Sequence, residues 1–354
     1  MALDPAHTPE GAAFRSSSFD GITAVALPVG ANSVGTVNMY VLADGDRATV
    51  VDCGVWHPAL PDGGLNAFTD GIHQAGYGIG DVSRLILTHA HIDHYGLAGA
   101  ILEKTGAELW MHAMTDRDCE NYRHPETSRS KHRDLYADHG VPDDTDYELA
   151  DHLTRWLPYV SSVVEASHRV RGGELTRIGG DEWELIHTPG HSYGHLCLWS
   201  RDRGVVISGD HLLPGVMPPV TFQRGFDPDP MRSYLGSLEA IRMRAPTLVL
   251  PGHGRAFGDA VGRIDAVARN KVRRLDRIRR LVMQAPCTVG MLTERLVGSG
   301  TAPHQRELAV DELFAHIVYL RHAGLIERRV GRDGIYEWFS TGDGPLDVAG
   351  LLRR

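Results

Sequence analysis

The chain has 354 residues, of which 42% are hydrophobic and 23% are charged, and its formal net charge at pH 7 is −9. This composition excludes a disordered or collagen-like chain, and no apolar run reaches the roughly 18 residues that a membrane-spanning helix needs. The length predicts one large domain with an appendage, or two domains. Because the first residues lack the basic and apolar segments of a secretory signal, we expect a cytoplasmic protein without a membrane partner.

Charge is distributed unevenly along the chain. Residues 255–354 carry 17 basic and 12 acidic side chains, a net charge of +5, whereas residues 1–254 have a net charge of −14. This difference predicts two modules of different character. The four cysteines are scattered without a Cys-x-x-Cys pair, so we expect neither a disulfide framework nor a thiolate zinc site.

Strands and helices alternate in the first third of the chain. β-Branched runs separated by Gly, Asp and Asn predict strands, and a buried strand leads directly into a histidine-rich loop at residues 89–96. The predicted strands cover 22–27, 37–42, 48–52, 84–88 and 108–112, and the helices cover 68–76 and 97–105. The loop follows the carboxyl end of a strand, where the functional groups of α/β layers usually gather.

The middle of the chain changes character. Between about residues 114 and 174 apolar residues follow helical spacing, which predicts a helical insertion that covers the site as a lid. Strands then return. They are predicted over 183–187, 196–200, 205–208 and 247–250, with a helix over 230–243 before the last strand.

The last hundred residues are predicted to be mainly helical. An amphipathic helix over 259–284 has Leu275, Ile278 and Val282 on one apolar stripe, which leaves its arginines facing solvent. Helices over 289–297 and 308–323 and a hairpin over 325–339 follow, an order typical of a winged-helix module. The predicted organisation is a catalytic domain over 1–262, a linker helix over 263–284, a winged-helix-like module over 285–341 and a tail over 342–354.

Seven side chains that can bind a metal follow apolar strands. Four of them fall within six residues, and the other three each stand beside glycine in Thr-Pro-Gly-His, Ser-Gly-Asp and Pro-Gly-His-Gly. Glycine lets the backbone turn sharply, so these side chains can be aimed at one point. Imidazoles with carboxylates suit zinc, and also iron or manganese. The seven are His89, His91, Asp93, His94, His191, Asp210 and His253.

The segment Thr-His-Ala-His-Ile-Asp-His-Tyr-Gly at 88–96, with the three later residues in order, resembles the metallo-β-lactamase superfamily over about residues 20–260. The resemblance implies an α+β fold, a four-layer αββα sandwich, and two divalent metal ions, with Zn²⁺ preferred over Fe or Mn. One metal would be held by His89, His91 and His191, and the second by Asp93, His94 and His253. Asp210 would bridge both metals, as in the hydroxyacylglutathione hydrolase branch, because the β-lactamases proper have cysteine at its position.

A dinuclear centre of this kind can hold a bridging hydroxide that attacks a carbonyl or phosphoryl group. Asp93 and Asp210 are therefore the expected catalytic residues, Asp93 by orienting the hydroxide, and no serine or cysteine nucleophile is required. Asp52 matches the first motif of the family and is expected to orient a ligand. His195 is expected to do the same or to be a hydrogen-bonded core histidine.

Weaker predictions concern the surroundings of the metals. Possible substrate-binding residues, for each of which packing is the alternative, are Tyr95, Tyr193, Tyr122, Arg123 and Trp156. The remaining histidines outside the motifs, including His112, His132 and His139, are expected on the solvated surface.

Three functions are compatible with these residues. The first is hydrolysis of a small activated acyl compound, either a thioester such as acyl-CoA, acyl-carrier or acyl-glutathione, or a lactone. The alternative is a single-strand endoribonuclease or phosphodiesterase, with RNA as the partner. It is suggested by the branch of the superfamily that has ribonuclease activity and also carries a winged helix. The negative charge of the catalytic module counts against RNA binding. An iron-dependent persulfide oxygenase is less favoured, because all seven positions for two metals are present. A homodimer is conceivable.

Overall fold

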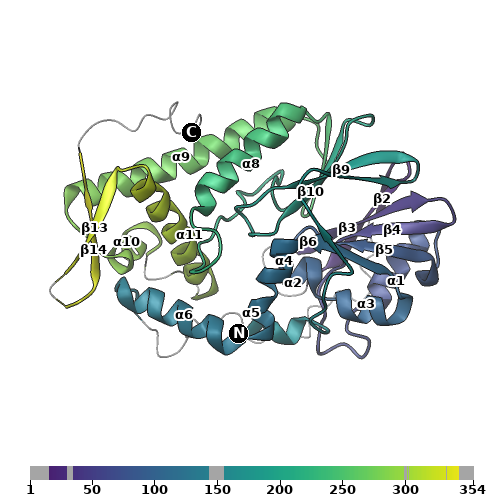
Figure 1. Ribbon diagram of the computed structural model, residues 1–354, viewed down its shortest axis with the longest axis horizontal. Coiled ribbons are helices and arrows are strands. Elements are labelled where there is room, and N and C mark those ends of the chain that lie inside the picture. Colours follow the sequence, from purple (N-terminus) through teal and green to yellow (C-terminus); the bar gives the residue numbers. More distant parts are fainter. Residues whose placement is uncertain are drawn as a thin grey trace.

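The computed structural model describes residues 16–29, 35–142, 155–298, 301, 303–331 and 333–342. Its largest sheet has seven strands in the order in which they occur along the chain (Figure 1). The first four strands are antiparallel, and the last four form parallel pairs. The strands are β1 (Ser16–Phe19), β2 (Ile22–Pro28), β3 (Thr36–Asp44), β4 (Arg47–Val51), β5 (Val82–Ile86), β6 (Glu108–His112) and β7 (His168–Val170).

The second sheet has five strands in the order β12-β11-β10-β9-β8. Only β11 and β12 are parallel, because helix α8 connects them; the other neighbours form antiparallel pairs. The strands are β8 (Glu174–Ile178), β9 (Asp181–His187), β10 (Leu196–Ser200), β11 (Val205–Gly209) and β12 (Leu248–Pro251). Most of the predicted strands therefore exist within one or two residues of their expected ends.

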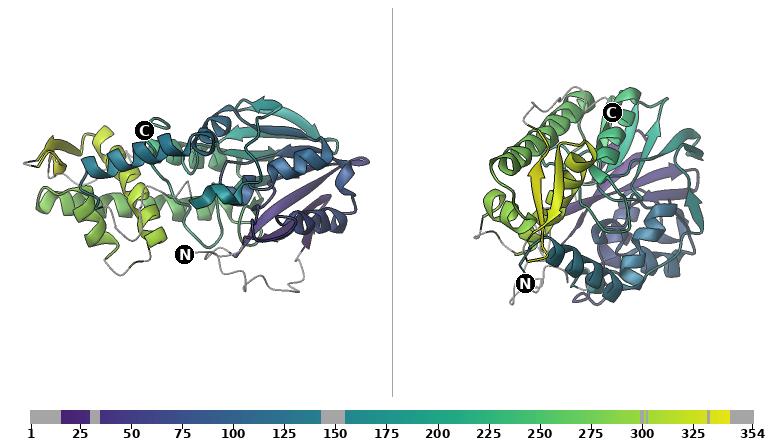
Figure 2. Two further views of the ribbon diagram at one scale, coloured as in Figure 1. Left: turned by 90° about the horizontal axis from the view of Figure 1, so that it is seen from below. Right: turned by 60° about the vertical axis from the view of Figure 1, so that its left-hand side comes forward.

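The two sheets face each other and carry helices on their outer faces. Between the sheets lies a buried apolar layer that includes Tyr40, Ile86, Trp183 and Leu198. Helices α1 (Leu65–Gln74) and α3 (Ala98–Thr105) pack on the outer face of the larger sheet, and α8 (Pro230–Arg244) and α9 (Ala260–Gln284) pack on that of the smaller one (Figure 2). The arrangement is the predicted sandwich of two sheets between helices.

In its described residues, the region predicted as a helical insertion includes α4 (Ala113–Asp118), α5 (Glu120–Arg123), α6 (Pro125–Asp138) and the 3₁₀ turn η4 (Leu157–Tyr159). Leu149 and Leu153, which contributed to the helical spacing, lie outside the described residues. The predicted range to residue 174 was too long, because β7 pairs with β6 as the edge strand of the larger sheet. Its three residues are too few to show an alternating pattern.

The C-terminal elements are α10 (Val289–Leu296), α11 (Pro303–His322), β13 (Ile326–Val330) and β14 (Tyr336–Ser340), in the predicted order of two helices and a hairpin. One apolar core continues from the outer face of the smaller sheet through α8 and α9 to α11 and the hairpin. It also includes Leu135 and Tyr136 of α6, whose Tyr136 ring is stacked 6.1 Å from that of Phe314. The C-terminal elements thus share their core with the sandwich.

Several polar side chains are more buried than expected. Lys271 and Arg279 on α9 are buried, which corrects the prediction that the basic face of this helix is solvated. His112, His132 and His139 are also buried, not on the surface. All four cysteines are free thiols with buried side chains. Within the described part of the chain, no helix combines the length and the apolar character needed to cross a membrane.

Candidate metal centre

The seven predicted donors meet at one edge of the sandwich, where strands from both sheets end. The loop after β5 leads into the one-turn helix α2 (Ile92–Tyr95), and loops after β9, β11 and β12 carry the other donors. Glycine is required beside them. A Cβ atom on Gly252 would lie 2.4 Å from Oδ1 of Asp210, and Gly190 has φ of 132° with Tyr234 against it. The glycine-flanked motifs are therefore explained by close backbone approach.

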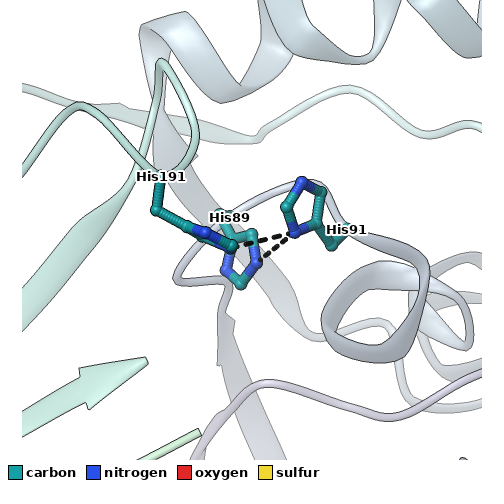
Figure 3. Close-up of side chains that lie close together, drawn as sticks. All are labelled: His89, His91 and His191. Carbon is teal, nitrogen blue, oxygen red and sulfur yellow. Dashed lines mark hydrogen bonds between the residues drawn. The ribbon is translucent and has the colours of Figure 1, made fainter. Parts of the chain in front are cut away.

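Three histidines form the first donor group (Figure 3). The Nδ1 atom of His91 lies 3.0 Å from Nε2 of His89 and 3.0 Å from Nε2 of His191. The other ring nitrogens of His89 and His191 are bonded elsewhere, to Thr88 Oγ1 at 2.9 Å and to the carbonyl of Pro219 at 2.9 Å. Each of these two rings therefore donates through Nδ1 and turns a bare Nε2 toward the other donors.

Asp93, His94 and His253 form the second donor group. Oδ2 of Asp93 lies 3.2 Å from Nε2 of His253 and 3.9 Å from Nε2 of His94. Nδ1 of His253 donates to the carbonyl of Thr36 at 2.7 Å, and Nδ1 of His94 donates to Asp52 at 2.7 Å. Here too the Nε2 atoms are directed at a common point.

Asp210 lies between the two groups. Its Oδ1 is 3.5 Å from Nε2 of His94, and its Oδ2 is 3.5 Å from Nε2 of His253 and 3.7 Å from Nε2 of His191. Oδ1 of Asp210 and Nε2 of His94 are buried without a hydrogen-bond partner, which is costly for polar atoms unless a cation binds them. The donor set fits two metal ions, since it can hold a metal in each group with Asp210 shared.

The protonation states of the two donor groups differ. Burial lowers the pKa of His91 to about 3 and lowers those of His89 and His191, so these rings are neutral donors. Burial would raise the pKa of Asp93, but His94 and His253 outweigh it and lower that pKa to about 2. Burial alone would lower the pKa of His253, but its hydrogen bonds with Asp210 and Asp93 outweigh burial and raise that pKa to about 10. Without a metal, protons therefore supply the positive charge in the second donor group, and a bound metal would displace them.

Both predicted orienting residues contact donors. Asp52, in the left-handed region with φ of 60°, accepts from the backbone N–H and the hydroxyl of Thr88, each at 2.8 Å, as well as from His94. His195 is fully buried, and its Nε2 accepts from the backbone N–H of Asp210 at 3.2 Å. Its Nδ1 is bonded to the hydroxyl of Thr188 at 2.8 Å.

An open pocket with about 600 Å³ of empty space lies next to the first donor group and includes His91 and His191 in its lining. Two of the five predicted substrate contacts, Tyr193 and Tyr122, line it. Sequence reasoning missed six other polar lining residues that lie outside the motifs. They are Asp118, Asn121, Ser192, Thr221, Gln223 and Asp227.

The other three predicted substrate contacts do not line this pocket. The hydroxyl of Tyr95 exchanges hydrogen bonds with the backbone of Val164, because successive residues of a helix point in different directions and His94 takes the metal side. Arg123 pairs with Asp116 at 2.9 Å and Glu120 at 2.6 Å. The ring of Trp156 lies 5.8 Å from that of Tyr159.

Residues 218–223, which we call the wall segment, connect the pocket to the C-terminal elements. The carbonyl of Pro219 accepts from His191, and Thr221 and Gln223 line the pocket. On the opposite side, the ammonium of Lys271 donates to the carbonyl of Pro218 at 2.7 Å and to Glu312 at 2.7 Å. The N–H of Phe222 donates to the carbonyl of Asp311 on α11 at 3.2 Å.

Comparison with known proteins agrees with the fold. The family model described as the Metallo-beta-lactamase superfamily matches residues 32–253. The chain belongs to this superfamily, and it is a metal-dependent hydrolase.

Two solved structures are similar over nearly the whole chain. A metallo-beta-lactamase family protein from Thermus thermophilus is 26% identical with a TM-score of 0.77, covering 91% of this chain and 99% of its own. A beta-lactamase domain protein from Burkholderia ambifaria is 27% identical with a TM-score of 0.79, covering 95% and 97%.

Three relatives carry functional names. The probable metallo-hydrolase YqjP of Bacillus subtilis is 25% identical over 78% of this chain and 84% of its own. The hydroxyacylglutathione hydrolase GloC of Haemophilus influenzae is 25% identical over 48% of this chain and 68% of its own. The atrochrysone carboxyl ACP thioesterase AacuM of Aspergillus aculeatus is 26% identical over 58% of this chain and 66% of its own.

Proposed function

We propose that the protein hydrolyses an activated acyl compound, a thioester or a lactone, at a dinuclear metal centre. The observation that carries the proposal is the position of Asp210 between two groups of three donors, with one carboxylate oxygen buried and unpaired. We propose His89, His91 and His191 as ligands of one ion and Asp93, His94 and His253 as ligands of the other, with Zn²⁺ as the metal that best suits nitrogen and oxygen donors.

Two bound cations supply Lewis-acid polarisation of the acyl carbonyl and lower the pKa of water in the site. The side chains of the protein position the attacking water and the substrate. Asp93 stands at the edge of the donor cluster with one oxygen near His253, so it can accept a hydrogen bond from the attacking water and orient it. The pocket beside His191 holds the remainder of the acyl compound, with Tyr193 and Tyr122 in contact with it.

The named relatives support an acyl substrate. One is named a hydroxyacylglutathione hydrolase and another an acyl carrier protein thioesterase. The ribonuclease alternative has less support. Two cationic side chains of α9, Lys271 and Arg279, are buried, so this helix offers a smaller basic surface than its sequence indicates. We propose instead that the C-terminal helices and hairpin form a winged helix that supports the wall segment.

The test combines metal content with activity. The purified protein is loaded with Zn²⁺, analysed for metal per chain, and assayed on a short-chain acyl thioester, a lactone and a labelled single-stranded RNA. We expect two metals and turnover of the thioester or lactone. Asp210→Ala is expected to bind fewer metals and to lose at least about 100-fold in kcat/KM, a loss of about 3 kcal/mol of transition-state stabilisation.

The matched control is Asp138→Ala, which removes a carboxylate that pairs with Arg224 at 2.9 Å outside the pocket. It is expected to leave metal content and activity unchanged. Cleavage of RNA alone would replace the acyl proposal with the phosphodiesterase. One iron per chain and no hydrolysis would contradict both.

A further inference from the structure

We infer that the group recognised in the pocket beside the metals is neutral or cationic, and that the site selects against acyl compounds whose leaving group carries a carboxylate. This inference rests on the proposed function and specifies its substrate class. Asp118 and Asp227 are the acidic residues of the lining outside the metal donors. Among the described residues that line the pocket, none is lysine or arginine.

The arginines nearest to the pocket in sequence do not line it. The guanidinium of Arg117 donates to the carbonyl of Gly225 at 2.8 Å and lies 5.7 Å from the centre of the ring of Phe226, a lining residue, and its charge offsets only part of the effect of burial, which raises the pKa of Asp118. Arg123 follows Tyr122 and pairs with two acidic residues of its own region. Arg224 follows Gln223 and pairs with Asp138 at 2.9 Å. Three basic residues thus flank lining residues without themselves lining the pocket.

The two carboxylates are fixed where they are. Oδ2 of Asp118 accepts from the hydroxyl of Ser192 at 2.7 Å and from the N–H of Gly194 at 3.1 Å. Oδ1 of Asp227 accepts from the N–H of Asp229 at 2.9 Å. These bonds prevent the side chains from turning away when a ligand enters. Apart from the cations that the donor groups would hold, a carboxylate of the ligand that lies against Asp118 and Asp227 would therefore meet like charges that no lysine or arginine of the lining offsets.

The uncharged part of the lining offers hydrogen bonds to a neutral group. Nδ2 of Asn121 donates to Oε1 of Gln223 at 3.1 Å, which joins α5 to the wall segment. The amide oxygen of Asn121 and the amide NH₂ of Gln223 are the complementary atoms for an amide-bearing ligand. A thiol or alcohol that carries an ammonium or an amide fits this chemistry, and one that ends in a carboxylate does not.

The experiment uses the metal-loaded full chain and three butanoyl thioesters that differ in the thiol: thiocholine, N-acetylcysteamine and 3-mercaptopropionate. The first leaving group is cationic, the second neutral and the third anionic. The assay is run at about pH 8.5, because burial raises the pKa of Asp118 to about 7 and its carboxyl must be ionised. We expect kcat/KM for the thiocholine and N-acetylcysteamine esters to exceed that for the mercaptopropionate ester by about tenfold or more, as two like charges within a partly buried pocket require. Added salt is expected to reduce the ratio.

Asp118→Asn and Asp227→Asn test the origin of the preference. Asparagine keeps an oxygen for the local hydrogen bonds, so the neutral ester reports whether the site is intact. Each variant is expected to lower the cationic-to-anionic ratio by about threefold or more, whereas Asp70→Asn, which changes an exposed carboxylate on α1, is the control and leaves the ratio unchanged.

The outcomes separate this inference from the proposed function. Hydrolysis of the mercaptopropionate ester as fast as the thiocholine ester, or a ratio that neither lining variant changes, would overturn the charge selection while the hydrolase proposal stands. If the metal-loaded protein hydrolyses none of the three thioesters and no lactone, the proposed function fails and this inference fails with it.

Discussion

At the scale of single residues, Thr88 and Asp52 determine which nitrogen each of two histidines presents to the metals. The hydroxyl of Thr88 has one proton, which it donates to Asp52 at 2.8 Å, so it must accept from Nδ1 of His89. Asp52 also accepts from Nδ1 of His94. One carboxylate therefore fixes the tautomers of a donor in each group.

We expect Asp52→Asn to weaken metal binding. Asparagine tolerates the left-handed backbone conformation at this position, so the change removes mainly the negative charge that orients His94. The expected loss is about 10- to 100-fold in affinity for at least one metal, measured by competition with a chromogenic chelator. Asp70→Asn, on the exposed face of α1, is the control. Unchanged affinity for both metals in Asp52→Asn would contradict this role.

The seven candidate donors could be singled out from the sequence because four of them share one loop after a strand and the other three each stand beside a glycine after a strand. The pocket could not. Asp118, Asn121 and Gln223 belong to no motif and reach the pocket only when α4, α5 and the wall segment fold against it. For Tyr95 the packing alternative describes the structure, since adjacency to His94 in a helix turns its side chain away from the donors.

At the scale of secondary-structure elements, two histidines form a stacked contact between the two sheets. His112 ends β6 in the larger sheet and His187 ends β9 in the smaller one, and their rings are stacked with centroids 3.8 Å apart. Burial, with a contribution from His187, lowers the pKa of His112 to about 4, and burial lowers the pKa of His187. Both rings are therefore neutral in the folded protein near pH 7.

We expect this stack to make stability depend on pH. The pKa of His112 in the fold lies below its unfolded value of about 6.5, so its contribution is fully present above pH 6.5 and is lost as the pH falls toward 4. At pH 5 the loss is about 2 kcal/mol. His112→Asn keeps an N-cap acceptor for α4 and should unfold with a smaller difference between pH 7 and pH 5, measured with urea.

The control for this experiment is His124→Asn, because the His124 side chain is 66% exposed. It should retain the pH dependence of the parent protein. An equal pH dependence in His112→Asn would contradict the role of the stack.

The strands and helices with clear periodicity could be predicted nearly to the residue, as β6 and β10 show. Short elements could not. β1 and β7 have four and three residues, and the turns of α4 and α5 depend on contacts with distant parts of the chain.

At the scale of the whole molecule, hydrogen bonds link α9 and α11 to the wall segment, which in turn accepts from the candidate donor His191. Lys271 is 1% exposed, and a lysine is this buried only when it is paired, here with Glu312. Its other contact, the carbonyl of Pro218, is next to the carbonyl that orients His191. Because a buried ion pair gives little net stability, we expect the main effect of Lys271 to be the position that it imposes on this segment.

We expect Lys271→Met to affect the metal centre from a distance. Methionine fills the space of the lysine stem but releases Pro218, and the unfolding free energy should fall by about 1–3 kcal/mol. The distinguishing result is a weaker affinity for one of the two metals, by about tenfold, in protein that remains folded. Arg280→Met, whose arginine is exposed on the same helix, should change neither property. Loss of stability with both metal affinities intact would leave Lys271 a purely structural role.

The sequence suggested separate modules because the charge of the last hundred residues differs in sign from that of the rest. The structure has one continuous helix, α9, across the predicted boundary at residue 262, and one apolar core on both sides of it. Charge patterns describe surfaces, whereas the extent of a core depends on long-range packing that no local pattern contains.

The buried cysteines have a consequence for thioester chemistry, which releases a free thiol with every turnover. Burial raises the pKa of Cys119 and Cys197 to about 12 and that of Cys287 to about 11, and it raises the pKa of Cys53 well above the usual value. Since the thiolate is the reactive form, we expect these sulfurs to attack neither a disulfide reagent nor the thioester substrate in the folded protein. The folded protein should react with no equivalents of a chromogenic disulfide, and the denatured protein with four. The same reagent can therefore record turnover continuously without consuming the enzyme that it reports on.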